Sequence, residues 1–388
     1  MAENAFKSTS TDKLLFTPGP LATSRSVKAA MTRDLGSRDR EFIEIVRAIR
    51  RNLLEIGEVP EATHTAIPMQ GSGTFGLESV LSSTIPPDGK LLVLENGSYG
   101  KRLMKIAEVL GIEAVSNETE EADPANPDKL EEMLQEDAAI TDVAIVHCET
   151  TTGILNPIKA IGKIAKRAGK RFIIDAMSSF GGISIGSELC GADYLVSSAN
   201  KCIEGVPGFS FVICRKSALL ETRERARSVC LDLHAQRTAL EADGQFRFTP
   251  PVQSLLAFHQ ALLELLAEGG VKKRAERYAG NRAALSRGMR KLGFAEYLSP
   301  EVQSDIITTF LYPGDPRFNF DTLYNRLSDR GCVIYPGKLT QAGCFRIGTI
   351  GHITESDISF LLTSLEEVLR EMHVALPVAP ITEADTAD

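Results

Sequence analysis

The sequence lacks several features that mark whole classes of proteins. It has no tryptophan, only 6% aromatic residues, no cysteine pair at CxxC spacing and no uninterrupted apolar run of transmembrane length in its 388 residues. Lys and Arg number 43 against 51 Asp and Glu, so the formal net charge is −8. We therefore expect no nucleic-acid partner and no membrane partner, because an acidic surface repels phosphodiester backbones and anionic lipid heads.

The seven cysteines are odd in number and lie mostly in apolar stretches. This is typical of reduced, buried thiols, so we expect a cytoplasmic protein without a disulfide framework and without a metal site. The N-terminus, MAENAFKSTSTDK, has no apolar run of signal-peptide length. With 43% hydrophobic residues, the chain is long enough for two or three structural units around a sizeable core.

Segments of strand character alternate with amphipathic helical segments through the first two thirds of the chain. The expected strands are 65–69, 90–94, 143–147, 171–175, 194–197 and 209–214, and helical periodicity lies between them, as at 103–110 and 161–168. This alternation indicates an α/β fold with a largely parallel sheet. Two long helices follow, over 252–268 and, beyond Gly269-Gly270, over about 271–291.

The pattern changes near residue 275. Strands expected at 305–312, 332–335 and 344–347, with helices at 321–330 and 355–372, indicate a smaller α+β unit. Thr354 and Asp357 have the spacing of a capping box that opens the last helix. We therefore predict an N-terminal segment (1–20), a large domain (21–275), a small C-terminal domain (276–375) and a flexible tail (376–388).

The motif Gly71-Ser72-Gly73-Thr74-Phe75-Gly76 follows an expected strand and opens a helix. Its GxGxxG spacing is that of a dinucleotide-binding turn, and Glu95 ends the next strand, where a ribose-binding carboxylate would lie. The same residues could cradle another phosphate, because free N–H groups at a helix N-terminus attract anions, or could form a plain turn. The motif alone leaves an NAD-dependent dehydrogenase, another phosphate ligand and a simple turn open.

Two later segments favour a different cofactor. Asp175 ends the apolar strand 171–175, and Lys201 follows the short strand 194–197. One strand–helix–strand excursion brings both to the carboxyl edge of the sheet, where open α/β sheets bind ligands. A lysine able to form a Schiff base, a carboxylate able to keep a pyridine nitrogen protonated and a Gly/Ser/Thr phosphate cup are what pyridoxal 5′-phosphate requires. Hydride transfer to NAD needs neither the lysine nor that carboxylate.

Seven blocks along nearly the whole chain resemble fold-type I pyridoxal-phosphate enzymes of the aminotransferase class V branch. They lie at 14–31, 70–81, 95–102, 146–158, 175–183, 197–213 and within 333–351. Within that branch they are similar to the 2-aminoethylphosphonate:pyruvate aminotransferases, and ETTTG, DAMSSFGG and SSANKCIEGVPGF are the most specific segments. The resemblance implies a large domain with a mostly parallel mixed sheet between helices and a smaller α+β C-terminal domain.

The resemblance also implies roles for individual cofactor contacts. Lys201 matches the lysine that forms the Schiff base and then moves a proton on the substrate, and Asp175 matches the partner of the pyridine nitrogen. The phosphate cup, the aromatic ring over the cofactor and a hydroxyl near its phenolic oxygen match Ser72, Gly73, Thr74, Tyr99 and Thr151.

Substrate and subunit contacts are implied in the same way. Arg346 matches the arginine that grips the substrate's acid group, for which a planar bidentate donor is suited. Thr249 would reach the cofactor phosphate from the other subunit, which implies a homodimer with shared active sites. The sequence departs from the family at Val252-Gln253 and at His234, both near the expected subunit boundary.

The implied reaction moves the amino group of 2-aminoethylphosphonate to pyruvate and gives phosphonoacetaldehyde and L-alanine. A transaminase of the same branch acting on alanine or serine with glyoxylate or pyruvate would share every cofactor residue. A cysteine desulfurase would need a reactive cysteine on a mobile loop, whereas Cys332 and Cys344 lie in expected strands. An NAD-dependent dehydrogenase leaves Asp175 and Lys201 without a role, and a non-catalytic cofactor-binding regulator remains an alternative from a different class.

Overall fold

The computed structural model describes residues 12–186, 190–339 and 342–379. Its centre is a seven-stranded sheet in which only β10 runs antiparallel to its neighbours. The strand order is β2 (His64–Gln70), β10 (Phe209–Arg215), β9 (Tyr194–Ser198), β8 (Arg171–Asp175), β5 (Ile140–Val146), β3 (Lys90–Glu95) and β4 (Glu113–Glu118). The predicted α/β class with a mostly parallel mixed sheet is confirmed.

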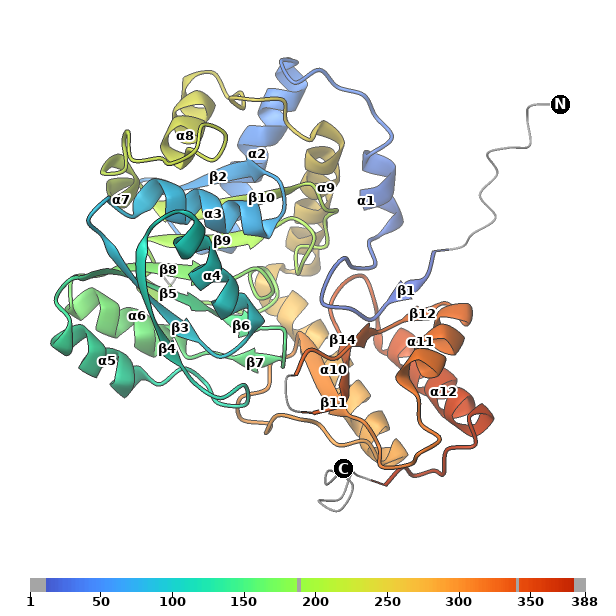
Figure 1. Cartoon of the computed structure of the whole chain (residues 1–388). Helices are drawn as coiled ribbons and strands as arrows, with labels where there is room; N and C mark the ends of the chain where they lie inside the picture. The colour runs from blue at the N-terminus through green and yellow to red at the C-terminus, as the bar shows by residue number, and fades with distance from the viewer. Residues whose placement is uncertain (1–11, 187–189, 340–341, 380–388) are drawn as a thin grey trace.

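Helices cover this sheet because their apolar residues recur at three and four positions. In α6 (Ile158–Arg167), the buried residues Ile158, Ile161 and Ala165 form such a stripe. α3 (Gly73–Thr84) packs on β9 and β10, and α4 (Ser98–Val109) packs on β3 and β4, in front of the sheet in Figure 1. The other helices of this part are α1 (Arg25–Ala30), α2 (Arg40–Ile56), α5 (Pro127–Glu136), α7 (Lys216–Leu220), α8 (Leu233–Ala242) and α9 (Val252–Glu268).

All six strands expected in this part are present, with ends shifted by a few residues at most. The strand β4 was missed. It lies at the edge of the sheet, its sequence is EAVSNE, and most of its residues are half-buried or exposed. An edge strand with polar side chains lacks the apolar run by which the inner strands were found.

A second, smaller unit lies beside the sheet, at the lower right of Figure 1. It contains the three-stranded antiparallel sheet β11 (Ile307–Leu311), β14 (Cys344–Gly348) and β13 (Tyr335–Pro336). Its helices are α10 (Gly270–Leu292), α11 (Phe320–Asp329) and α12 (Glu355–Glu371). The capping box predicted at Thr354 and Asp357 is confirmed, with both reciprocal hydrogen bonds present.

The N-terminal segment belongs to the packing of this smaller unit. β1 (Leu14–Leu15) pairs in parallel with β12 (Cys332–Val333), and Phe16 is fully buried in the core formed by the C-terminal elements. α10 packs on both α9 and α12, and so connects the large sheet's last helix with the smaller unit. The boundaries at 20/21 and 275/276 stay predictions. β1 nevertheless shows that the N-terminal segment packs with the C-terminal elements, although it precedes the large domain in the chain.

Ordered packing continues at least to residue 378. Val378 is buried in the same core, and its N–H donates to the carbonyl of Leu292 at 2.7 Å. Of the predicted N-terminal segment and flexible tail, residues 1–11 and 380–388 lie outside the described residues.

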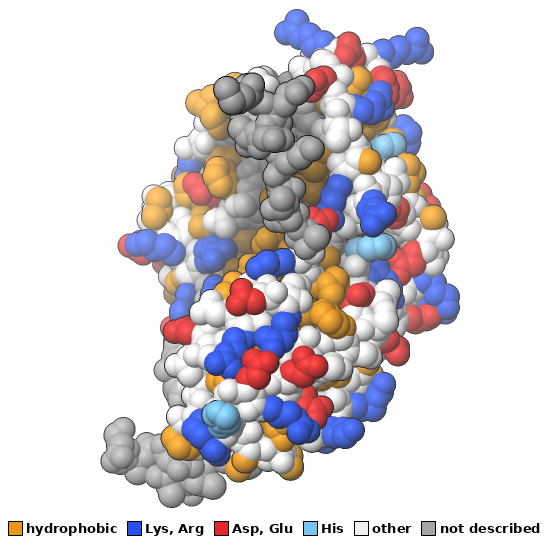
Figure 2. Space-filling view, turned by 90° about the vertical axis from the view of Figure 1, so that its right-hand side faces the viewer, with side chains coloured by type: hydrophobic (Ala, Val, Ile, Leu, Met, Phe, Trp, Pro, Cys, Tyr) orange, Lys and Arg blue, Asp and Glu red, His pale blue; other side chains and the backbone are white. Residues whose placement is uncertain are grey.

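The cysteines carry free thiols, and five of the seven are buried: Cys148, Cys202, Cys214, Cys332 and Cys344. Among the described residues, no helix combines the length and apolarity that a membrane span requires. On the face shown in Figure 2, Lys and Arg side chains are interspersed with Asp and Glu.

Candidate active site

A cavity of about 220 Å³ lies where the carboxyl ends of β8 and β9 meet the N-termini of α3 and α4. Six of the predicted site residues line it: Ser72, Gly73, Thr74, Tyr99, Asp175 and Lys201. These residues come from four separate stretches of the chain. The sheet edge therefore brings together the groups that the sequence motifs singled out.

Lys201 lies in the loop that follows β9. Its Nζ donates to the carbonyl of Pro18 at 2.8 Å, so the lysine reaches across to the N-terminal segment. Gly19 makes this approach possible: its φ is +129°, and a Cβ there would lie 2.5 Å from Nζ. Burial lowers the pKa of Lys201 to about 8, and the positive charges of Arg102 and Arg346 act in the same direction.

Asp175 is the last residue of β8 and is almost fully buried. Its Oδ1 accepts the N–H of Met177 at 2.9 Å, whereas Oδ2 has no donor among the described residues. Burial raises the pKa of Asp175 to about 7, and the positive charges of Arg102 and Lys201 partly offset this rise. A buried carboxylate with one free oxygen is suited to pair with a cationic N–H donor in the cavity.

The N-terminus of α3 forms one wall of the cavity. Ser72 is the N-cap residue, but its side chain makes no capping hydrogen bond. The Phe75 N–H donates to the Ser72 carbonyl at 2.9 Å, whereas the N–H groups of Gly73 and Thr74 have no acceptor among the described residues. Gly73 keeps this wall open, because a Cβ there would lie 2.3 Å from the Met177 sulfur. Free N–H groups and the hydroxyls of Ser72 and Thr74 make this helix end a suitable phosphate cradle.

Tyr99 lies in the first turn of α4 and is half-buried. Arg102, which was not among the predicted site residues, also lines the cavity. Its Nη1 donates to the Thr74 hydroxyl at 3.2 Å, and its Cζ lies 4.7 Å from the Tyr99 ring centroid. The three-residue spacing from Tyr99 on a helix, within the matched segment ENGSYGKR, was the signal that could have found it.

A second residue that was missed, Glu149, lies behind Tyr99. It is fully buried, and its carboxylate accepts the N–H groups of Tyr99 at 3.0 Å and Thr151 at 3.2 Å. Burial raises the pKa of Glu149, and the hydrogen bonds that it accepts from Thr151 and Tyr99 oppose this rise. Thr151 also donates its hydroxyl to Glu149 and accepts the N–H of Ser98 at 3.2 Å. Thr151 is therefore one layer behind the cavity lining.

Arg346 lies on β14 and is 2% exposed. Its Nη1 donates to the carbonyl of Thr150 at 2.6 Å and its Nε to that of Pro336 at 2.9 Å. Nη2 has no acceptor among the described residues. Burial lowers the pKa of Arg346, with the charge of Glu149 among the groups that oppose this. The guanidinium is thus held at the seam between the large sheet and the small domain.

Thr249 does not line the cavity. It is exposed, and its carbonyl accepts a hydrogen bond from Gln70 Nε2 at 3.0 Å. The family departures at Gln253 and His234 also lie outside the cavity lining. Their part in a subunit boundary stays a prediction.

The topology argues against the dinucleotide reading of the GxGxxG motif. In a dinucleotide-binding unit, the strands before and after the glycine turn belong to one parallel βαβ arrangement. Here β2 lies at the sheet edge, is antiparallel to β10 and is separated from β3 by four strands. Glu95, the proposed ribose ligand, is buried outside the cavity lining.

Comparison with known proteins identifies the class that this fold and site define. The family model for aminotransferase class-V matches residues 22–337. A pyridoxamine-pyruvate aminotransferase from Mesorhizobium loti superposes with a TM-score of 0.86 at 26% identity, covering 95% of each chain. The chain therefore belongs to the class-V aminotransferases, and the predicted family is confirmed.

Sequence relatives narrow the assignment further. The 2-aminoethylphosphonate–pyruvate transaminase of Syntrophobacter fumaroxidans is 50% identical over 92% of this chain and 96% of its own length. The transaminase of the same name from Bacillus cytotoxicus is 49% identical over 91% of this chain and 97% of its own. Within the class, this chain falls in the family of those transaminases.

Proposed function

We propose that the protein transfers the amino group of 2-aminoethylphosphonate to pyruvate and releases phosphonoacetaldehyde and L-alanine. The observation that carries this proposal is the 49–50% identity to transaminases of that name over nine tenths of the chain. The cavity that joins Lys201, Asp175 and the N-terminus of α3 supports it.

The residues lining the cavity fit pyridoxal 5′-phosphate. When bound, this cofactor supplies an aldehyde that can be bonded to an amine and a ring that takes up the electrons of a broken C–H bond. The uncapped helix end at Ser72, Gly73 and Thr74 would hold its phosphate, with the Arg102 guanidinium beside it. Asp175 Oδ2 would accept the ring N–H, and Lys201 would carry the covalent bond.

The chain's own residues then account for the chemistry. The amine-bearing carbon of 2-aminoethylphosphonate has no carboxylate, so its proton is acidified only through the cofactor, whose positive ring Asp175 stabilises. Lys201 Nζ, released when the substrate's amine takes its place on the cofactor, would be the base that removes this proton and the acid that later returns it. Arg346 binds the phosphonate of the donor and the carboxylate of pyruvate, which keeps the reacting carbon next to Lys201.

We also propose that two copies of the chain form the active unit in the cytoplasm. Phe75 and Phe248 are large hydrophobic residues with 50% and 43% exposure. Phe75 directly follows Thr74 of the phosphate cradle. Phe248 precedes Thr249, and its backbone carbonyl accepts a hydrogen bond from Gln70 Nε2 at 3.0 Å. A second copy covering this area would bury both rings and bring its own Thr249 to the cradle.

Half-reactions with separate amines test the proposed function. The purified, cofactor-loaded protein is mixed with 2-aminoethylphosphonate, alanine or serine alone, and its visible absorption is followed. True donors convert the coloured form in a single turnover, so 2-aminoethylphosphonate and alanine should bleach it and serine should not. Bleaching by serine and alanine without any by 2-aminoethylphosphonate would favour the serine- or alanine-specific alternative. A protein that responds to no amine would favour a non-catalytic role.

The pKa of Lys201 predicts how the cofactor-free protein captures its cofactor. The neutral amine is the nucleophile, and the cation is inert. Because the pKa of Lys201 lies at about 8, the capture rate should rise roughly tenfold per pH unit below about pH 8 and level off above it. Stopped-flow absorbance of the cofactor-free protein measures this. A rate still rising steeply up to pH 10 would mean that Lys201 has an ordinary lysine pKa.

Arg346→Ala should weaken substrate binding without removing the cofactor's covalent bond. The variant loses the charge-assisted hydrogen bonds between the guanidinium and the substrate's acid group, which contribute roughly 1.5–3 kcal/mol to binding. KM for both 2-aminoethylphosphonate and pyruvate should therefore rise by about 10- to 100-fold. Steady-state kinetics and the visible spectrum are measured together. Arg346→Lys, which keeps the charge but not the bidentate geometry, serves as the matched variant. Unchanged KM values for both substrates in the alanine variant would remove Arg346 from the substrate site.

A further inference from the structure

Glu204 occupies an unusual position in the loop that carries Lys201. Its N–H donates to the Lys201 carbonyl at 2.7 Å, and its φ of +66° lies in the left-handed region, which is costly for a residue with a Cβ. Its side chain is buried, and Oε1 accepts hydrogen bonds from Arg277 Nη2 and the Tyr278 hydroxyl, both at 2.7 Å. These contacts hold the lysine loop in its strained form.

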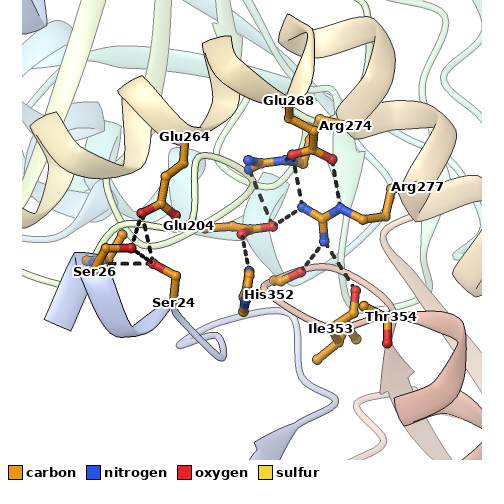
Figure 3. A network of polar contacts seen from close by, with 12 residues as sticks. Ser24, Ser26, Glu204, Glu264, Glu268, Arg274, Arg277, His352, Ile353 and Thr354 are labelled. Atoms are coloured by element: carbon orange, nitrogen blue, oxygen red, sulfur yellow. Dashed lines mark hydrogen bonds and ion pairs between the residues drawn. The ribbon is translucent and has the colours of Figure 1, made fainter.

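The ion pairs around Glu204 form a balanced cluster. Glu268 accepts from Arg274 Nε at 2.6 Å and from Arg277 Nε at 2.8 Å. Arg274, 2% exposed, also donates to the carbonyl of Cys202 at 2.7 Å. Figure 3 shows the two carboxylates and the two guanidinium groups facing one another below α9 and α10. Buried charges of this kind are tolerated only when each has its partner, so removing one leaves another uncompensated.

The same face of α10 also holds the small-domain loop that follows β14. Arg277 Nη1 donates to the carbonyls of Gly351 at 2.7 Å and Ile353 at 3.2 Å. Asn281 Nδ2 donates to the Thr349 carbonyl at 3.2 Å. Thr349 directly follows β14, the strand that carries Arg346.

The four α10 residues involved share one stripe of the helix. Arg274, Arg277, Tyr278 and Asn281 are spaced at three and four positions, which places them on one face. On one side the stripe binds the lysine loop, and on the other it binds the loop after Arg346. None of the four is among the residues that line the 220 Å³ cavity, and the hydrogen bonds described above join them to the two loops instead.

We propose that Glu204 and Arg277 are positioning residues that set the separation between Lys201 and Arg346. This inference rests on the proposed function, in which Lys201 moves the proton and Arg346 holds the acid group of the same small substrate. Only one methylene separates the amine-bearing carbon from the phosphonate. The substrate is therefore too short to adjust its length if a shift of the small-domain loop changes the distance between Lys201 and Arg346. A misplacement of about 1 Å costs about a hundredfold in rate in such sites.

The first test compares Glu204→Gln with the wild-type holoenzyme. Glutamine keeps the size of the side chain but leaves Arg277 paired with Glu268 alone. We expect kcat/KM for 2-aminoethylphosphonate to fall at least about tenfold, with KM for pyruvate rising in parallel, while borohydride still fixes the cofactor to Lys201. Unchanged kcat and KM in a folded, fully loaded variant would overturn the proposal. If the wild-type enzyme itself does not use 2-aminoethylphosphonate, the proposed function fails instead.

Hydrogen exchange provides a readout that does not depend on activity. Glu204→Gln should raise amide exchange both in the lysine loop (199–206) and in the loop 349–353. Faster exchange in the lysine loop alone would mean that Glu204 supports only its own turn and would overturn the link. Glu371→Gln, which removes an exposed carboxylate paired with Arg326 and Arg330, is the matched control and should alter neither loop.

A second variant, Arg277→Lys, covers the case in which Glu204→Gln does not fold, and the two variants together form a double-mutant cycle. Arg277→Lys keeps the positive charge but lacks the planar fork with which Nε, Nη1 and Nη2 donate separately to Glu268, the Gly351 carbonyl and Glu204. Alone, it should reproduce the kinetic and exchange changes. Combined with Glu204→Gln, it should add less than twofold to the loss of kcat/KM, because the two residues act as a unit. If the loss of kcat/KM in the double variant equals the product of the losses in the two single variants, Glu204 and Arg277 act independently. That result would overturn the proposal that they act as a pair.

Discussion

Replacing Lys201 with alanine is expected to lower transamination by about a thousandfold or more and to remove the covalent cofactor bond. Lys201 is the lysine lining the described cavity, and Asp175 and the α3 N-terminus face the same space. The variant loses both the attachment point and the group that moves the proton, so kcat should fall rather than KM alone. Steady-state assays without added amines measure this loss.

Borohydride reduction and peptide mapping give the second readout for this variant. In the wild-type protein the reduced cofactor should be found on the peptide containing Lys201, and in the variant no peptide should carry it. Lys163→Ala, which removes an exposed lysine of α6, controls for the loss of a lysine as such. Retained turnover in Lys201→Ala, or an adduct at another lysine of the wild-type protein, would contradict the assignment.

Asp175→Asn should lower turnover by about 100- to 1,000-fold while leaving the cofactor attached to Lys201. The amide has the same shape as the carboxylate but carries no charge, so it cannot hold a proton on the ring nitrogen. Because the reacting carbon of 2-aminoethylphosphonate has no carboxylate of its own, the loss falls on proton removal. The burial that raises the pKa of Asp175 to about 7 makes a positive partner necessary for full ionisation near neutral pH.

Single-turnover kinetics and the visible spectrum separate this effect from a loss of binding. The expected signature is a slow half-reaction with a shifted absorption band and nearly normal cofactor content. Asp88→Asn, in the exposed turn after α3, is the matched control. Wild-type rates with an unchanged spectrum in Asp175→Asn would show that Oδ2 does not face the ring nitrogen.

The strands that end at the active site could be predicted because each carries its signal locally. The apolar stretch before Asp175 and the short strand before Lys201 identify two parallel strands, and carboxyl ends of such strands meet at one sheet edge. The glycine-rich motif at Ser72 was found in the same way but was ambiguous by itself, and Asp175 and Lys201 favoured the pyridoxal cofactor over NAD. The position of β2, at the sheet edge and antiparallel to β10, is a second and independent argument against the dinucleotide interpretation.

Other parts of the site carry no local signal. Glu149 is a buried carboxylate whose partners, Tyr99 and Thr151, are recognised only when β6 (Cys148–Glu149) lies against the start of α4. The same holds for β7 (Ile154–Leu155), which pairs with β6 to close the turn between them. Periodicity shows which face of an element is apolar, but it does not show which other element covers that face.

By itself, the sequence determined the fold class, the family and six of the residues that line the cavity, because these depend on local periodicity and on motifs read in order. The tertiary structure alone decided that Lys201 reaches the Pro18 carbonyl and that Arg346 reaches the Thr150 carbonyl. It also decided that β1 packs in the small domain. Each of these contacts joins residues far apart in the chain, and such pairs are chosen by the packing of whole elements against one another rather than by any local preference of the residues involved.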